Sequence, residues 1–134
     1  MNYFLDTYNA IDMEFHKNKP IYLQIVDVLA SKIITKAWTK GMKIPTVKEL
    51  AKELDVNHNT LMRSIELLQM EKILFAKRGV GLFLTDESYD NALELMRRSF
   101  YEEQVPEFFS TMHTLKITLG ELIDLYKTNK RENS

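Results

Sequence analysis

The strongest constraint on the fold is a short break, Asp55-Val56-Asn57, between two amphipathic segments of helical character. Ahead of the break, Thr46 is followed three residues later by Glu49, which is the pattern of a helix N-cap with a capping box. Asn57 is itself a favoured N-cap residue, so a second helix is expected to begin there. Helices with so short a connection cannot lie parallel, and the pattern therefore predicts two helices that cross steeply, as in a helix-turn-helix.

A hairpin with a basic tip follows the two helices. Two short apolar runs, residues 73–77 and 82–85, flank the sequence Arg78-Gly79-Val80-Gly81. Two glycines in so short a connection favour a tight turn between paired strands. The order helix, turn, helix and two-stranded hairpin is the layout of a winged helix-turn-helix. We therefore expect a mainly α fold with a small β-wing, followed by two C-terminal helices.

The residues before this motif provide a supporting helix. Pro20 suits the first turn of a helix, because the N–H group that proline lacks has no partner there. The helix is expected to end near Ala37, before Gly41, and its apolar residues recur at helical spacing. That apolar face comprises Ile21, Ile25, Val28, Leu29, Ile33 and Trp38. Residues 1–16 fit neither period, and we expect them to form a short helix or strand on a neighbouring surface.

The C-terminal region carries two further helical patterns. Asp86 is expected to cap the first, and Pro106 to start the second, which continues past Tyr126. Apolar residues recur at alternating spacings of four and three, and such a heptad-like seam suits packing against another helix. The expected dimerisation residues are Leu93, Met96, Phe100, Phe108, Met112, Leu115, Leu119 and Leu122. The alternative is that both helices pack onto the same winged domain.

We accordingly assign residues 1–85 to an N-terminal extension and a winged domain, and residues 86–134 to a helical dimerisation region. Charge divides the chain in a similar way. Residues 17–85 hold 12 Lys/Arg and 6 Asp/Glu, whereas residues 86–134 hold 6 and 10, and residues 1–16 add three acidic groups; the whole chain has a net charge of −1. A basic middle with acidic flanks indicates a polyanionic partner for the middle only.

The predicted second helix of the motif offers the groups that read DNA. Its inward face is expected to comprise Leu61, Ile65, Leu68 and Met70. A helix fits the major groove, and its N-terminal residues reach base edges and phosphates. The basic turn of the hairpin can enter the minor groove or lie along phosphates, and a lysine in the first turn of the preceding helix can meet a phosphate. The candidate DNA-binding residues are Lys48, Asn57, His58, Asn59, Thr60, Met62, Arg63, Lys77, Arg78 and Gly79. Each alone also fits a solvated surface helix or a generic basic hairpin; their order and spacing carry the interpretation.

Several stretches resemble the GntR family of bacterial transcription regulators. They are Pro20-Ile21-Tyr22-Leu23-Gln24-Ile25, the run from Gly41 through Ile44-Pro45-Thr46-Val47-Lys48-Glu49-Leu50-Ala51, Val56-Asn57-His58-Asn59-Thr60-Leu61, and Lys77-Arg78-Gly79-Val80-Gly81-Leu82-Phe83-Leu84. The resemblance covers residues 20–84 and implies a winged helix-turn-helix that binds double-stranded DNA, as a homodimer on a palindromic operator.

Three residues depart from the commonest family pattern. Lys48 stands where arginine is usual, which keeps the charge but loses the bidentate fork. His58 and Met62 also stand where arginine is frequent, and methionine cannot donate a hydrogen bond to a phosphate or a guanine. The operator is therefore expected to differ from those of better-known relatives, and Arg63 is expected to have a larger role.

The short C-terminal region resembles that of the YtrA-type subfamily, which implies a helical tail that pairs the subunits. We expect the chain to be a transcriptional repressor and to be cytoplasmic. A small-molecule effector at that tail is a further expectation, with no identity given by the sequence. Enzymatic, metal and cofactor interpretations find no support: cysteine is absent, and His16, His58 and His113 are far apart with no acidic neighbour at metal-ligand spacing. No apolar run reaches the roughly 18 residues of a membrane span. The competing interpretation is a winged-helix module that binds protein instead of DNA.

Overall fold

A computed structural model of the chain describes residues 19–132, with side chains as far as residue 130. The expectation for residues 1–16 lies outside this range. The chain divides into two compact units, Met1–Met96 and Arg97–Ser134, and each is described by itself. The first unit extends 11 residues beyond the expected boundary at residue 85, because the start of the following helix packs onto the winged domain through Ala92, Leu95 and Met96.

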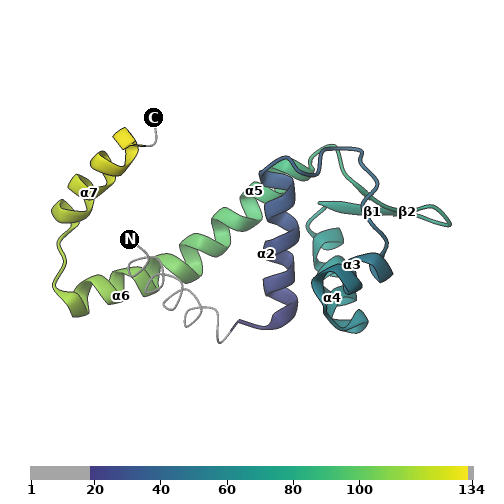
Figure 1. Cartoon of the computed structure of the whole chain (residues 1–134), viewed down its shortest axis with the longest axis horizontal. Coiled ribbons are helices and arrows are strands. Elements are labelled where there is room, and N and C mark those ends of the chain that lie inside the picture. Colours follow the sequence, from purple (N-terminus) through teal and green to yellow (C-terminus); the bar gives the residue numbers. More distant parts are fainter. Residues whose placement is uncertain (1–18, 133–134) are drawn as a thin grey trace. The chain divides into compact units, whose positions relative to one another are not determined.

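The first unit is a winged helix-turn-helix. It contains α2 (Ile21–Ile34), α3 (Val47–Leu54), α4 (His58–Met70), β1 (Leu74–Lys77), β2 (Gly81–Leu84) and the first part of α5 (Ser88–Ser99). Figure 1 shows α2 beside the α3–α4 pair, with the hairpin of β1 and β2 projecting beyond them. The expected fold class, mainly helical with a small β-wing, is confirmed.

One apolar core joins these elements. Leu29 of α2, Leu50 of α3 and Leu61 of α4 are completely buried in it, and Leu84 closes it from the wing. Each such side chain contributes about 1.5–3 kcal/mol when it leaves water, so the crossing of the three helices is fixed mainly by this contact. The polar ends of the helices remain outside.

The turn between α3 and α4 forms as the sequence predicts. The Thr46 hydroxyl accepts a hydrogen bond from the Glu49 N–H group at 3.1 Å, which caps α3. Asp55 ends that helix in the left-handed region at φ 51°. The Asn57 side-chain oxygen then accepts from the Asn59 N–H group at 2.8 Å and caps α4. Both predicted N-caps are therefore confirmed.

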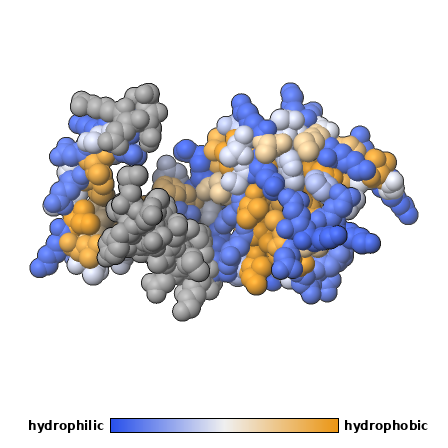
Figure 2. Space-filling model, in the orientation of Figure 1, coloured by the Kyte–Doolittle hydropathy of each residue, from blue (hydrophilic) through white to orange (hydrophobic). Residues whose placement is uncertain are grey.

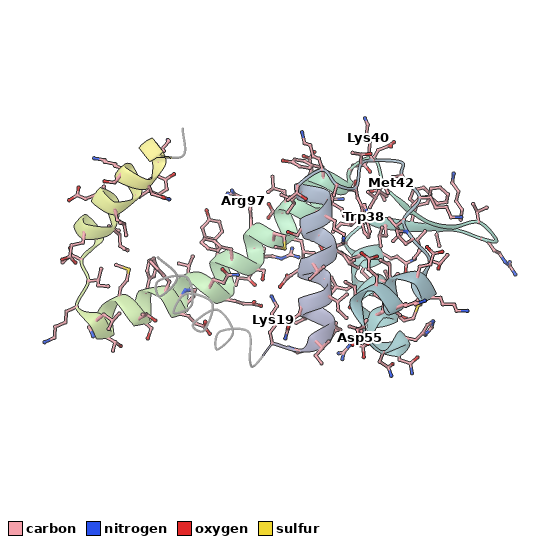
Figure 3. All side chains as sticks on the ribbon, in the orientation of Figure 1. Lys19, Trp38, Lys40, Met42, Asp55 and Arg97 are labelled. Atoms are coloured by element: carbon pink, nitrogen blue, oxygen red, sulfur yellow. The ribbon has the colours of Figure 1, made fainter. Side chains whose placement is uncertain are left out.

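The end of α2 differs from the expectation. The helix stops at Ile34 instead of near Ala37, because Lys36 adopts a left-handed backbone at φ 64°. The Trp38 N–H group then donates to the Lys32 carbonyl oxygen at 2.9 Å. This bend turns the indole back into the core, where it is buried although it lies beyond the helix (Figure 3).

Three residues expected on apolar faces lie in solvent instead. Ile21 and Val28 of α2 are exposed, and Met70 at the end of α4 is 82% exposed. The inward face of α4 ends with Leu68. Met70 follows two residues later, so its side chain projects from the opposite side of the helix. The buried faces are therefore narrower than apolar identity alone predicts.

The wing is a short antiparallel hairpin. Its register pairs Leu74 with Leu84 and Lys77 with Gly81. Compared with the expected runs, β1 begins one residue later and β2 begins one residue earlier. An isolated bridge between Lys43 and Phe83 adds a third chain segment at the edge of β2. Gly79 has φ 77°, a left-handed conformation that suits glycine at the tip of the turn.

The second unit is helical on both sides of one short break. A π-helical turn, η1 (Phe100–Gln104), leads directly into α6 (Val105–Leu115), and α7 (Leu119–Glu132) follows. Pro106 lies in the first turn of α6, as expected, but this helix does not continue past Tyr126. The chain breaks instead at Lys116, which has φ 58°. The long seam from Pro106 past Tyr126 is therefore two helices.

A reciprocal capping box starts α7. The Thr118 hydroxyl accepts from the Glu121 N–H group at 3.2 Å, and the Glu121 carboxylate accepts from the Thr118 N–H group at 2.8 Å. Among the helices of residues 19–132, none is long and apolar enough to cross a membrane.

Candidate nucleic-acid interface

The first two turns of α4 present a polar face to solvent. Its inward side is fully buried and comprises Leu61, Ser64, Ile65 and Leu68. Asn59 and Arg63, one helical turn apart on the opposite side, are both exposed, as is His58. Exposed amide, imidazole and guanidinium groups on one helix face have the chemistry that reads base edges and phosphates in a major groove.

The remaining predicted residues of α4 lie at the margins of this face. Thr60 and Met62 are half-buried. Asn57 is exposed, and its side-chain oxygen accepts the capping hydrogen bond, which fixes the amide at the start of the helix and leaves its N–H groups free to donate to a ligand. The predicted residues at this end of α4 thus lie close together, and Asn57 has primarily a capping role.

Glu66 extends the same outward face and was not predicted. It is exposed and lies three residues after Arg63, so both side chains project from one side of α4. A carboxylate there can accept a hydrogen bond from a cytosine amino group and repels a phosphate. The helical spacing of Asn59, Arg63 and Glu66, at four and three residues, is the signal that could have found it.

Arg63 is stacked on a residue of another helix. The guanidinium carbon of Arg63 lies 3.8 Å from the centre of the Tyr22 ring in α2. The neighbouring residue Ser64 donates a hydrogen bond from its hydroxyl to the Tyr22 carbonyl oxygen at 2.7 Å. Tyr22 is 42 residues from Ser64 in sequence, and nothing in its local pattern predicts this contact.

The wing carries an aromatic pair beneath a lysine. Phe75 and Phe83 stack across the two strands with ring centres 5.7 Å apart. The Lys77 ammonium lies 4.5 Å from the Phe83 ring centre and 5.9 Å from that of Phe75. Lys77 therefore lies over the face of the hairpin and, like Arg78 and Gly79 at the tip, remains exposed to solvent.

Two more lysines border these elements. Lys48 is exposed in the first turn of α3, as predicted. Lys43 was not predicted; its side chain crosses Gly81 so closely that a Cβ atom there would come within 2.8 Å of the Lys43 Cε atom. Cationic groups thus lie on β1 (Lys77), at the tip (Arg78) and on the segment beside β2 (Lys43), which suits a polyanion.

The predicted dimerisation residues differ in exposure. Phe100, Phe108, Leu115 and Leu119 are between 48% and 64% exposed. Leu93, Met96, Met112 and Leu122 are half-buried, and Met96 packs partly against the core of the winged unit. Several other exposed apolar residues of the second unit lie outside the predicted seam, among them Phe109, Ile123 and Leu125.

Within the described part of the chain, no group of three His, Asp or Glu side chains is placed to hold a metal ion. The geometry instead combines a capped helix with a polar outer face and a cationic hairpin. This arrangement suits contact with a large anionic surface.

Comparison with known proteins decides the family. The family model described as "Bacterial regulatory proteins, gntR family" matches residues 21–84. The HTH-type transcriptional regulator YhcF of Bacillus subtilis is 30% identical over 118 residues, which span 88% of this chain and 96% of that protein. The chain belongs to the GntR family.

Other GntR-family proteins support the same assignment over nearly the full length. The transcriptional repressor YtrA of Bacillus subtilis is 25% identical, over 87% of this chain and 89% of its own. A GntR-family structure from Bacteroides thetaiotaomicron superposes with a TM-score of 0.70 at 32% identity, over 86% of this chain and all of that one. The resemblance seen in the sequence is confirmed: this is a transcriptional regulator with a DNA-binding helix-turn-helix, and its relatives are regulators and not enzymes.

Proposed function

We propose that this GntR-family regulator is a repressor that binds a palindromic operator as a homodimer. Each copy places the outer face of α4 in a major groove, with His58, Asn59 and Arg63 toward the bases. Arg78 and Gly79 at the wing tip lie along the adjacent backbone or minor groove, and Lys48 meets a phosphate. Two copies then read half-sites separated by about 10 base pairs or a multiple of that.

The observation that carries the dimer is the absence of a core in the second unit. Of the described side chains from Arg97 to Lys130, none is buried. Nine of the fifteen exposed large hydrophobic residues of the described chain lie in this unit. Figure 2 shows hydrophobic atoms gathered on the segment that contains α7. Helices in water derive most of their stability from packing an apolar face, so these helices need a partner surface.

A second copy of the chain is the partner that this surface fits best. In a dimer, the apolar residues of each helix pack against the same apolar residues of the second copy. Symmetric dimers are by far the commonest assemblies. A stable interface buries roughly 800 Å² on each partner, which several exposed aromatic and leucine side chains can supply. The name of YtrA, a transcriptional repressor, supports repression as the outcome of DNA binding.

The first experiment measures mass and DNA binding together. Light scattering on the eluted protein should give twice the chain mass of 15.8 kDa. A gel shift with the DNA upstream of the chain's own gene should show one complex whose affinity falls steeply with salt, because phosphate contacts release counterions. A monomeric mass, or no shift even at low salt, would contradict the proposal.

Two substitutions separate positioning from sequence reading. Arg78→Ala should weaken binding to every DNA sequence, since the wing contacts backbone. Asn59→Ala should cost about 1–3 kcal/mol on the operator and also reduce the preference for it over other DNA. Equal behaviour of both variants and the native chain would favour the alternative in which the winged helix binds protein.

A small-molecule effector is a second proposal for the C-terminal helices. Phe108 and Phe109 are exposed and Met112 is half-buried on α6, and apolar side chains of this kind line ligand cavities as well as dimer interfaces. Comparison of operator affinity in fresh cell extract with that in buffer tests it. A dialysable factor that changes the affinity would support it, and equal affinities would count against it.

A further inference from the structure

Arg63 on the outer face of α4 makes a close contact with another helix. Its guanidinium carbon lies 3.8 Å from the Tyr22 ring centre. The other cation–ring distances in the described chain range from 4.5 to 5.9 Å. At 3.8 Å the planar guanidinium and the ring are in direct contact, a geometry that arginine forms and lysine cannot reproduce.

The backbone that carries Tyr22 is held against α4 without any ligand. Its backbone carbonyl oxygen accepts the 2.7 Å hydrogen bond from the buried Ser64 hydroxyl, next to Arg63 in sequence. The start of α2 is tied further by an ion pair of 2.6 Å between Lys19 and Asp27. The Gln24 side chain also donates to the Lys19 carbonyl oxygen at 2.8 Å. Ring and recognition helix are therefore joined at two adjacent positions.

The stack orders Arg63 and leaves its donors available. Contact with a ring uses the flat face of the guanidinium, whereas its five N–H groups point outward in the plane. Arg63 is exposed and lies one turn after Asn59, on the side of α4 that faces a major groove in the proposed complex. A free arginine side chain loses conformational entropy when a ligand immobilises it, and an arginine that is already ordered loses less.

We infer that Tyr22 is a positioning residue of the DNA interface, whose aromatic face aims the Arg63 guanidinium at the operator. The inference rests on the proposed DNA binding and adds to it a residue outside the helix-turn-helix. The first turn of α2 therefore contributes to operator affinity. It does so by ordering Arg63, and Tyr22 itself makes no contact with the DNA.

The test is a double-mutant cycle on the full-length chain. Operator affinity is measured by fluorescence anisotropy for the native chain, Tyr22→Leu, Arg63→Ala and the double variant. Leucine keeps the backbone carbonyl for Ser64 and an apolar side chain, but removes the ring. Tyr22→Leu should weaken binding about 5- to 30-fold, and should have no further effect once Arg63 is alanine.

Two controls isolate the ring. Tyr22→Phe retains the aromatic face and should bind within about twofold of the native chain, as the cation–ring contact does not use the hydroxyl. Tyr22→Leu combined with Arg78→Ala should give effects that multiply, because the wing tip has no part in the stack. Thermal unfolding of each variant confirms that it is folded. If Tyr22→Leu does not fold, Arg63→Lys replaces it, and should lose most of the affinity lost in Arg63→Ala.

The outcomes separate this inference from the proposed function. Three outcomes would overturn the positioning role while the native chain still binds its operator. The losses in Tyr22→Leu and Arg63→Ala could multiply in the double variant, or Arg63→Ala could leave the operator affinity unchanged. The third outcome is a loss of affinity in Tyr22→Phe as large as that in Tyr22→Leu. Failure of the native chain to bind any DNA would instead contradict the function itself.

Discussion

At the scale of single residues, Ser64 joins the recognition helix to its support. Its buried hydroxyl donates to the Tyr22 carbonyl oxygen of α2 at 2.7 Å. Ser64→Ala removes the donor and leaves that carbonyl without this bond, so the free energy of unfolding should fall by about 1 kcal/mol. Urea denaturation measures this change.

The matched control for Ser64 is Thr114→Ala. The Thr114 hydroxyl also donates to a carbonyl oxygen, that of Ser110 at 3.1 Å, but within one helix and in solvent. Its loss should change the free energy of unfolding by less than about 0.5 kcal/mol. An equal decrease in the free energy of unfolding in the two variants would show that the hydrogen bond between α2 and α4 stabilises the fold no more than a bond within one exposed helix.

The two glycines of the wing should respond differently to alanine. Gly79 has φ 77° and open space around the position that a methyl group would take, so alanine there should cost roughly 1–2 kcal/mol from its left-handed backbone alone. Gly81 has φ 144°, which is far less accessible to alanine, and the methyl group would also displace Lys43. Gly81→Ala should therefore have the lower melting temperature of the two, and the reverse order would contradict this account of the hairpin.

Individual interface residues were predictable only where local pattern determines them. Asn57 and His58 follow from the start of a helix, and Arg78 from the tip of a hairpin. Tyr22 was not predictable, because its contact with Arg63 depends on how α2 and α4 cross, and those residues are far apart in the chain. Glu66 was predictable from helical spacing alone, since it continues the outward face beyond the first two turns of α4.

At the scale of elements, helix ends were harder to predict than helices. Four residues other than glycine have positive φ in the described chain, and they are Lys36, Asp55, Lys72 and Lys116. Left-handed lysine gives no signal in a sequence, so the ends of α2 and α6 were misplaced. Asp55 was recognised because its break lies between two clear N-caps.

This observation predicts a stabilising substitution. Lys72 is exposed, with φ 57°, in the turn that joins α4 to β1. Its carbonyl oxygen accepts from the Thr85 hydroxyl at 2.7 Å and from the Asn91 amide at 3.1 Å, and neither bond needs the lysine side chain. Lys72→Gly should relieve the left-handed strain and raise the free energy of unfolding, measured by urea denaturation, by up to about 1 kcal/mol.

The control for this turn is Lys72→Ala, which removes the same side chain but keeps a Cβ atom. It should leave the free energy of unfolding within about 0.5 kcal/mol of the native chain. Equal gains from alanine and glycine would place the effect in the lost charge and not in the backbone.

At the scale of the whole molecule, self-association should depend on the apolar residues of α6 and α7. Leu115 is 62% exposed at the end of α6. Leu115→Lys would place a charge in the proposed interface, so the mass measured by light scattering should move from dimer toward monomer and operator affinity should fall. Ser110→Lys, at an exposed polar position on the opposite side of the same helix, is the matched control and should remain dimeric.

The sequence predicted the winged unit better than the second unit for a physical reason. Residues 46–84 specify the turn between α3 and α4 through caps and the tip of the wing through glycines, and their core lies within the same chain. The C-terminal helices have no core of their own in the described residues, so their spacing indicates that they need a partner without determining where each helix breaks.

The coreless second unit has a consequence for gene dosage. Where stability requires two copies, the folded fraction depends on protomer concentration. At low abundance the dimer population follows the square of the monomer population, so halving synthesis would leave about one quarter of the dimers. A repressor built in this way would release its promoter over a narrow range of its own abundance.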